Sequence, residues 1–157
     1  MNYDRRPPSG GPRGFERAAT APVVSIDTAP VKLGADMPEL LFADIAQEAA
    51  RTIAAAGAGR NNKSSQLRKF YDELVMWHDK LAFEKTADAR AAKYRELAPF
   101  IKMMNAKVAY ARGRGHVDQN FEQLFSHLIR QIACPATLKN AKLFMEAVLG
   151  FLKAEEK

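Results

Sequence analysis

From residue 36 onward, apolar side chains recur three and four positions apart, which is the spacing of an amphipathic helix. The stretch 65–83 shows the pattern most clearly. One side of that expected helix carries Leu67, Phe70, Tyr71, Leu74, Trp77, His78 and Leu81. The period-2 alternation typical of strands is missing from 36–157. The pattern therefore predicts an all-α fold, a single bundle of about five to six helices.

Helix start and stop signals divide the first part of this bundle. Asp36 and Glu39 have the spacing of a capping box, and Pro38 between them falls in a first turn, where proline is tolerated. We therefore expect a first helix from 36 to about 56, ended by a glycine-rich turn. The second helix is expected to span 65–83.

Proline and capping residues set the later boundaries. Pro99 has no amide hydrogen, so a break or kink is expected there, with a fresh helix running over about 99–112. Asp118 is expected to cap the next helix, over about 119–133. Thr137 is expected to cap the last helix.

Residues 1–35 have a different composition from the rest of the chain. They hold five of the eight prolines and four of the nine glycines. Such a segment buries too little apolar surface to offset the entropy lost on ordering. We predict a disordered proline- and glycine-rich tail over 1–35 and a helical-bundle domain over 36–157.

The side of the 65–83 helix opposite its apolar face mixes charged and apolar residues. It carries Lys69, Glu73, Met76, Lys80 and Phe83. Exposed Met76 and Phe83 would indicate contact with another molecule. The alternative is a helix buried on two sides within its own bundle, and the pattern leaves both open.

Composition limits the function classes. The formal charge of +6 favours anionic partners, although such a charge also occurs in proteins without them. The lone Cys134 excludes an internal disulfide and is expected to be a small core residue. No apolar run reaches the roughly 20 residues of a membrane span, and no apolar segment follows Arg5 and Arg6. We therefore expect a cytoplasmic protein.

Motifs that would carry chemistry are missing. The three histidines, at 78, 116 and 127, lack metal-ligand spacing, and the carboxylates are scattered over outer helix faces. No strand precedes a glycine-rich phosphate loop. The sequence thus predicts a binding protein without catalytic residues, metal or cofactor. A small helical enzyme is an alternative that would need a metal or substrate pocket.

Two basic runs without any acidic residue carry the strongest signal. Residues 60–69 contain Arg60, Lys63, Arg68 and Lys69, and residues 98–117 contain Lys102, Lys107, Arg112 and Arg114. Local excess of this kind concentrates positive potential that the net charge of the whole chain dilutes.

Helical geometry sorts the residues of the second run. Its solvent side is expected to hold Lys102, Asn105, Ala106, Ala109 and Arg112, and its inner side Phe100, Met104, Val108 and Ala111. Lys107 projects among the inner set, where an unpaired ammonium is costly. It must extend to an edge, pair with a carboxylate or reach a functional anion. Tyr110 is expected either to contact RNA, by stacking on a base or by a hydrogen bond to a phosphate, or to be a half-buried core residue.

Several of these motifs, in this order, resemble the small subunit of type III-A CRISPR effectors, the Csm complex. The resemblance covers about residues 60–153. It is carried by Ser65-Gln66-Leu67-Arg68-Lys69-Phe70-Tyr71, by Leu97 and Pro99 to Lys102, by Ala106-Lys107-Val108-Ala109-Tyr110-Ala111 with Arg112 or Arg114, and by Phe144 with Ala147-Val148.

The resemblance implies a non-catalytic RNA-binding scaffold. Copies of such a subunit stack into a filament beside the backbone subunits that carry the crRNA, and they contact target RNA along the guide–target duplex. RNA cleavage then belongs to the backbone subunit, and nucleotide and DNA chemistry to the large subunit. By position, the resemblance implies RNA contact by Arg68, Lys69, Lys102, Lys107, Tyr110, Arg112 and Arg114.

A function of a different class also fits the residues. A helical protein–protein adaptor would use its basic stripes to dock acidic partner helices, with the Met76 and Phe83 side as an interface.

Overall fold

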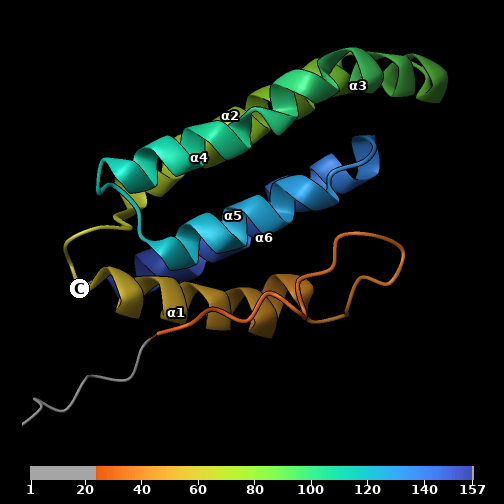
Figure 1. Ribbon diagram of the computed structural model, residues 1–157. Helices are drawn as coiled ribbons and strands as arrows, with labels where there is room; N and C mark the ends of the chain where they lie inside the picture. The colour runs from red at the N-terminus through yellow and green to blue at the C-terminus, as the bar shows by residue number, and fades with distance from the viewer. Residues whose placement is uncertain (1–23, 157) are drawn as a thin grey trace, which may run out of the picture.

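The computed structural model describes residues 24–156, and every regular element in that range is a helix (Figure 1). A short π-helical turn, η1 (Leu41–Ile45), leads into α1 (Ala46–Gly57). The remaining elements are α2 (Ser64–Ala82), α3 (Ala87–Lys102), α4 (Met104–Gly113), α5 (Gln119–Gln131) and α6 (Pro135–Glu155). The predicted all-α bundle is confirmed, and the predicted second helix is correct to within one residue at each end.

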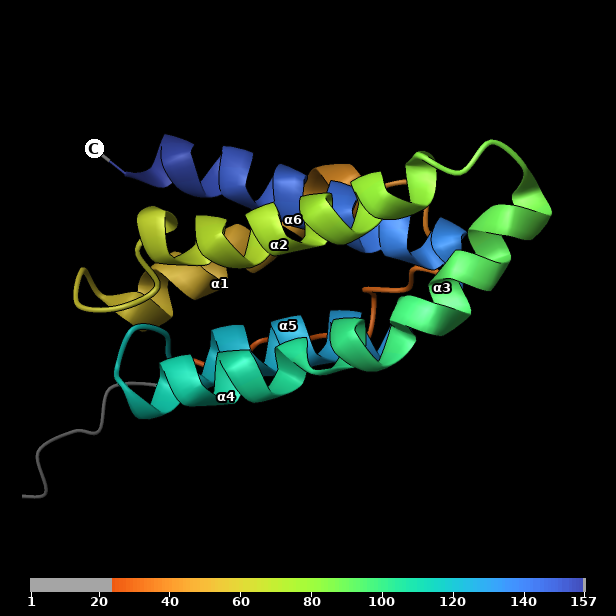
Figure 2. The ribbon, with the colours of Figure 1, turned by 90° about the horizontal axis from the view of Figure 1, so that it is seen from above.

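The C-terminal helix α6 organises the bundle. It packs along α1 and along α2, and it also contacts η1, α3 and α5, while α4 packs on α5. Figure 2 shows α3 crossing at one end of the molecule from the end of α2 to the start of α4. Because α3 makes this crossing, α2 and α4 run antiparallel.

The core has the composition that the periodicity predicts. Leu67, Leu74 and Leu81 of α2 lie seven residues apart and are all buried. The ring of Phe70 lies 5.5 Å from that of Phe121 and 5.0 Å from that of Phe125, which joins α2 to α5. Tilted aromatic pairs of this kind stabilise by roughly 0.5–1.5 kcal/mol each beyond the area they bury.

Residues 24–35 pack on the helices, so the prediction of a disordered tail over 1–35 is wrong for this part; residues 1–23 lie outside the described range. Ile26, Val31 and Leu33 are buried and belong to the hydrophobic core. We call residues 24–35 the strap. The three apolar side chains supply the burial that the proline and glycine content of the segment had seemed to exclude.

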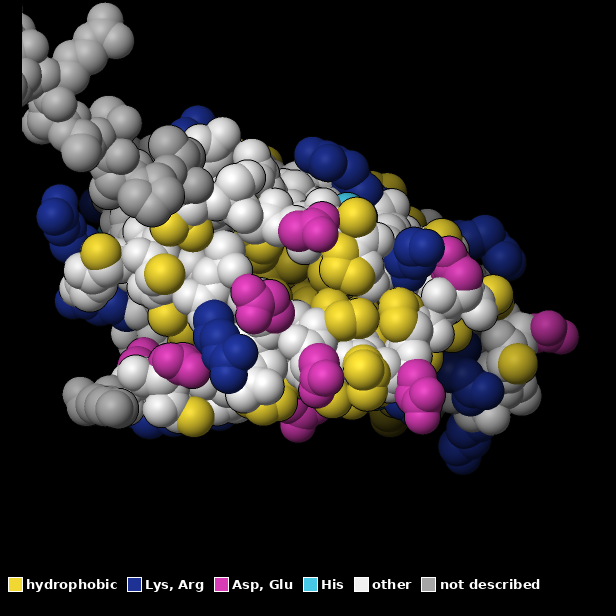
Figure 3. Space-filling view, turned by 90° about the horizontal axis from the view of Figure 1, so that it is seen from below, with side chains coloured by type: hydrophobic (Ala, Val, Ile, Leu, Met, Phe, Trp, Pro, Cys, Tyr) yellow, Lys and Arg dark blue, Asp and Glu magenta, His cyan; other side chains and the backbone are white. Residues whose placement is uncertain are grey.

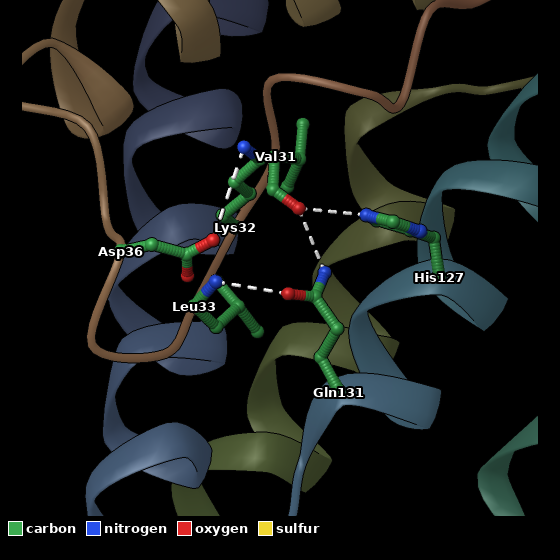
Figure 4. A network of polar contacts seen from close by, with 6 residues as sticks. All are labelled: Val31, Lys32, Leu33, Asp36, His127 and Gln131. Atoms are coloured by element: carbon green, nitrogen blue, oxygen red, sulfur yellow. Dashed lines mark hydrogen bonds and ion pairs between the residues drawn. The ribbon is translucent and has the colours of Figure 1, made fainter.

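Side chains of α5 bind the backbone of the strap (Figure 4), and Asn140 of α6 adds a further hydrogen bond. Gln131 accepts a hydrogen bond from the amide of Leu33 at 2.9 Å and donates one to the carbonyl of Val31 at 2.7 Å. His127 Nε2 lies 2.6 Å from the same carbonyl, and Asn140 donates to the carbonyl of Leu33 at 2.8 Å. These side chains replace the partners that a neighbouring strand would give, so an irregular segment can be buried.

The first helix begins at Leu41 and not at Asp36. Residues 36–40 form turns, and Ala43 within η1 has non-helical dihedral angles of φ −112° and ψ −105°. The predicted capping box is absent, because no helix starts at Asp36 and the N-cap of η1 is Leu40, which has no capping side chain. The carboxylate of Asp36 instead lies 3.8 Å from the ammonium of Lys32 in the strap. The helix ends at Gly57, as predicted to within one residue.

Pro99 does not break the third helix, which continues to Lys102. The discontinuity lies at Met103, and α4 starts immediately after it. Pro99 is on the exposed side of α3. The carbonyl that loses its amide donor, four residues earlier, can therefore be hydrated, which lowers the cost of a proline inside a helix.

The last helix begins at Pro135 with Cys134 at its N-cap, so the prediction that Thr137 is the cap is wrong. Thr137 lies inside the first turn, where its hydroxyl accepts hydrogen bonds from the amides of Ala133 and Cys134 at 2.8 and 3.0 Å. Cys134 is only partly buried, so it is not the small core residue that was expected. Asp118 caps α5 as predicted, accepting from the amide of Phe121 at 3.0 Å.

Candidate nucleic-acid interface

The loop before α2 and the loop before α5 are bound together at one end of the bundle. The side-chain amide of Asn62 donates to the carbonyl of Ile53 and to the carboxylate of Asp118, at 3.1 and 2.7 Å. Its oxygen accepts from the amide of Asp118 at 2.9 Å, and its own backbone amide donates to the carbonyl of His116 at 3.0 Å. A single buried asparagine therefore fixes both loops relative to each other.

We call this network of hydrogen bonds between the two loops the clasp, and Asp118 is its charged residue. Burial acts to raise the pKa of its carboxyl, but hydrogen bonds from Asn62, Asn120 and the amide of Phe121 outweigh burial and hold the pKa below its ordinary value. The backbone of Asn62 is left-handed, with φ 57°, a conformation that asparagine tolerates. A Cβ at Gly57 would lie 3.1 Å from Cβ of Asn62, so a side chain at position 57 would require Asn62 to shift by a few tenths of an ångström.

The end of α4 turns the chain sharply toward α5. The amide of His116 donates to the carbonyl of Ala111, and the amide of Gly115 donates to that of Arg112, both at 3.0 Å. Gly115 has a φ of +75°. This is the Schellman arrangement, in which a glycine in the left-handed region ends the helix. It fixes the turn 112–116 on the surface beside the Asn62 loop.

These two loops and the first turns of α2 carry the exposed cations Arg60, Lys63, Lys69 and Arg114. We call these four residues, together with the exposed neighbouring His116, the basic end. None of them forms an ion pair with another residue in the described part of the chain. The Lys69 ammonium donates a hydrogen bond to the side-chain oxygen of Gln66 at 3.3 Å. Their charge is therefore available to an external anion.

Tyr110 and Arg114 form a flat, exposed pair within this region. The guanidinium carbon lies 5.8 Å from the centre of the ring, and the guanidinium donates to the hydroxyl at 3.1 Å. Tyr110 is 66% exposed, which decides between the two predictions made for it: it is not a core residue. An aromatic ring and a guanidinium plane are the groups on which unpaired bases stack.

Other cations of the predicted site have carboxylate partners. Lys107 pairs with Glu73 of α2, the structural pairing that was one of the three predicted alternatives. Arg112 Nε lies 3.0 Å from Glu122 of α5. The longest of these pairs joins Arg68 to Asp72 at 3.8 Å, with both side chains largely exposed.

Lys102 does not project to solvent, so that prediction is wrong. Its ammonium donates to the carbonyls of Ile129, Arg130 and Ile132, at 2.6, 3.5 and 2.5 Å. Those carbonyls end α5, where a lysine complements both the unsatisfied acceptors and the helix dipole. Burial lowers the pKa of Lys102. The structure therefore uses this lysine to cap a helix.

The exposed apolar residues lie elsewhere. Met76 and Phe83 of α2 are 40% and 83% exposed, so that side of the helix is not buried in the bundle. They line an open groove of about 860 Å³ between α2 and α3, together with Val75 and Leu97. Phe100, expected on the inner side of its helix, is half exposed and lies with its ring 6.4 Å from that of Trp77, while Met104 and Val108 are buried as predicted.

The sequence interpretation counted Arg60 and Lys63 in the first basic run and gave His116 an unspecific contact with phosphate, but it included none of the three among the predicted RNA-contact residues. The signal was present, since Arg60 and Lys63 begin the first acid-free run. What the sequence did not show is that the Asn62–Asp118 clasp brings this run beside the end of the second one.

The described part of the chain contains neither a cluster of metal ligands nor a membrane-spanning helix. Within 24–156, no three histidine, cysteine, aspartate or glutamate side chains are grouped so as to hold a metal ion. None of the helices in that range has the length and apolar content needed to cross a membrane.

Comparison with known proteins identifies the chain. A family model described as Csm2 Type III-A matches residues 41–157, which include every residue of the basic end. No curated protein and no solved structure matches. The resemblance noted for about residues 60–153 is thereby confirmed and extended through η1 and α1. The chain belongs to the Csm2 type III-A family, and is thus a structural subunit that assembles with the other subunits of the type III-A CRISPR complex.

Proposed function

We propose that this subunit contacts the RNA of its complex with the basic end, by gripping phosphates of the sugar-phosphate backbone. The observation that carries the proposal is the set of exposed cations at Arg60, Lys63, Lys69 and Arg114, which have no carboxylate partner among residues 24–156. Arg60, Lys63 and Arg114 lie on the two loops that buried hydrogen bonds hold together, and Lys69 lies on the first turns of α2. Pre-positioned cations bind a polyanion with little loss of their own conformational entropy.

The Tyr110–Arg114 pair adds a second kind of contact. Its exposed ring can stack on an unpaired base of a single strand, which requires no particular sequence because every base has a π-face. Neither the contacts with phosphates nor the stacking on bases involves the hydrogen-bonding edges of the bases, so neither depends on the RNA sequence. In this proposal, guide pairing supplies sequence specificity, and the subunit recognises the backbone of target RNA along the guide–target duplex.

We propose further that copies of the subunit lie side by side along that duplex, against the backbone and large subunits, and that they perform no catalysis. The proposal places this work in the cytoplasm. Of the predicted RNA-contact residues it retains Lys69, Tyr110 and Arg114 as principal groups, and Arg68, Lys107 and Arg112 as weaker ones because each already has a carboxylate partner. Lys102 is left out because its ammonium caps α5.

The test uses the full chain and single-stranded RNA of mixed sequence. Four phosphate contacts predict a slope of log K against log salt of about −3. Reversing three charges, with Arg60→Glu, Lys63→Glu and Arg114→Glu, should weaken binding roughly a hundredfold at low salt, because each lost charged hydrogen bond is worth about 1 kcal/mol or more. The slope should flatten to about −1 in the same variant.

A matched control changes the net charge equally at other places. Lys85, Arg95 and Lys139 are exposed and lie outside the basic end. Reversing these three to glutamate should leave most of the affinity. Equal losses in both variants would mean that only net charge matters, and the assignment of the basic end would then be wrong. Unchanged affinity in the first variant would reject it as well.

A further inference from the structure

The face formed by α1 and the strap has a hollow at its centre, where hydrophobic side chains gather (Figure 3). The hollow measures about 300 Å³, room for one aromatic side chain. Its apolar lining comes from Ile26 and Pro30 of the strap, from Ile45 at the end of η1 and from Ala49 in α1. An apolar depression on an exposed face marks a place where another group binds.

The charged residues around this hollow are all acidic. Asp27, Asp44 and Glu48 line it, and its lining includes no lysine or arginine. Only Glu48 has a cationic partner among the described residues, Arg51 at 3.7 Å. A chain with a net charge of +6 therefore presents a local negative surface here. The charge excludes RNA as an occupant and selects a basic one with an apolar side chain.

The chain itself contains a segment of that description. Residues 1–23 hold four arginines against Asp4 and Glu16, a balance of 4 − 2 = +2. Within them, Phe15 stands two residues after Arg13 and two residues before Arg17. Residues 13–17 thus combine one aromatic ring with two arginines and one acid, Glu16, a balance of 2 − 1 = +1. An aromatic side chain in a positively charged segment matches an apolar hollow with three carboxylates at its rim.

We propose that residues 13–17 dock on the α1–strap face of their own chain, with Phe15 in the hollow and with Arg13 and Arg17 on Asp27, Asp44 and Glu48. The inference is independent of RNA binding, since the basic end lies on other loops. It assigns the proline- and glycine-rich start of the chain to a surface that the helices leave open.

The length of the connection fits docking within one chain. Ser25, which lines the hollow, follows Val24 directly. Nine peptide steps separate Phe15 from Val24, and they span at most about 30 Å when extended. Because the hollow adjoins Ser25, the distance from Val24 to the hollow is only a short part of this maximum span. A connection this short also gives a high effective concentration, so weak contacts suffice.

A photo-crosslinking experiment on the full chain tests the proposal. With p-benzoylphenylalanine in place of Phe15, irradiation should join position 15 to peptides containing residues 25–30 or 44–52. Mixing ¹⁵N-labelled and unlabelled chains identifies links within one chain. Reversing the rim with Asp44→Lys and Glu48→Lys should lower the yield about tenfold, and adding Arg13→Glu and Arg17→Glu should restore it, because the ion pairs are then re-formed with opposite sign.

The control reverses Asp72 and Asp79 to lysine in the α2–α3 groove, which changes net charge equally and should leave the yield unchanged. Links scattered over the surface, links mainly between chains, or a rim reversal that tail reversal does not rescue would each overturn the proposal. RNA affinity measured on the same variants separates this result from that of the basic end, because docking can fail while RNA binding is intact.

Discussion

Lys102 and Arg114 come from the same acid-free run of the sequence, yet they do different work at opposite ends of α4. Lys102 precedes the helix, and its ammonium is enclosed by carbonyls that end α5. Arg114 follows the helix, and its guanidinium lies on the exposed ring of Tyr110. The first cation completes the fold, and the second is available to a partner.

The difference comes from what lies opposite each cation. The end of a neighbouring helix lies beside Lys102 and supplies acceptors without any carboxylate. A tight glycine turn and a solvent-facing loop surround Arg114. A run of basic residues therefore indicates positive potential only after the cations that satisfy helix ends and carboxylates have been set aside.

The largest expected effect is on stability, from Lys102→Met. The substitution keeps the length of the side chain and removes the donor from three helix-end carbonyls. We expect unfolding to become easier by about 2 kcal/mol, the usual value for hydrogen bonds that involve a charged group. Urea unfolding followed by circular dichroism measures the change.

Arg114→Met is the matched control for Lys102→Met, because it removes the exposed cation and leaves the cation that caps α5. Its side chain is exposed, so the free energy of unfolding should change by about 0.5 kcal/mol or less, while RNA affinity falls. The opposite pattern, with a stable Lys102→Met variant that binds RNA poorly, would show that Lys102 is an RNA ligand and that the comparison is wrong.

A smaller effect, about 1–2 kcal/mol, is expected for Asp118→Asn in the clasp that supports the basic end. The amide NH₂ of an asparagine would face the donating amides of Asn62 or Asn120, so one hydrogen bond is lost. The effect should depend on pH, because the folded state lowers the pKa of Asp118.

The sign follows from linkage. A lowered folded pKa contributes stability that is complete above the unfolded value, near 3.8, and is lost as pH falls through the folded value. Wild-type stability should therefore drop below about pH 4 more steeply than that of Asp118→Asn. Parallel curves for the two proteins would remove Asp118 as a source of acid sensitivity.

Helices with a strong repeat could be predicted from the sequence, because their signals are local. The apolar face of α2 and the Asp118 cap of α5 depend on residues within one or two turns, and both are confirmed. The strap could not be predicted, since Gln131 and Asn140 satisfy its backbone from about 100 residues away. Composition alone could not show that Ile26, Val31 and Leu33 meet a core.

The candidate site was predictable only in part, for a similar reason. Lys107 could be assigned a need for a partner from its position on the helix, but the identity of Glu73 follows from the antiparallel arrangement of α2 and α4. The same arrangement places Lys69 one turn from Glu73 in the direction of the basic end. Which cations are free and which are paired therefore depends on contacts between residues that are far apart in the sequence.

The smallest effect concerns two arginines on the same turn. Arg112 is held by Glu122 at 3.0 Å, and Arg114 has no carboxylate partner in the described part of the chain. Arg112→Ala should therefore weaken RNA binding by less than about 1 kcal/mol and hardly change the salt slope, because its charge is already neutralised. Arg114→Ala should weaken binding more and reduce the slope by about 0.7. Titrations over a salt series measure both the affinity and the salt slope.

Glu122→Gln serves as the control, because it releases Arg112 from its carboxylate partner. RNA affinity should then rise slightly, and a drop instead would show that the ion pair positions Arg112 for the RNA.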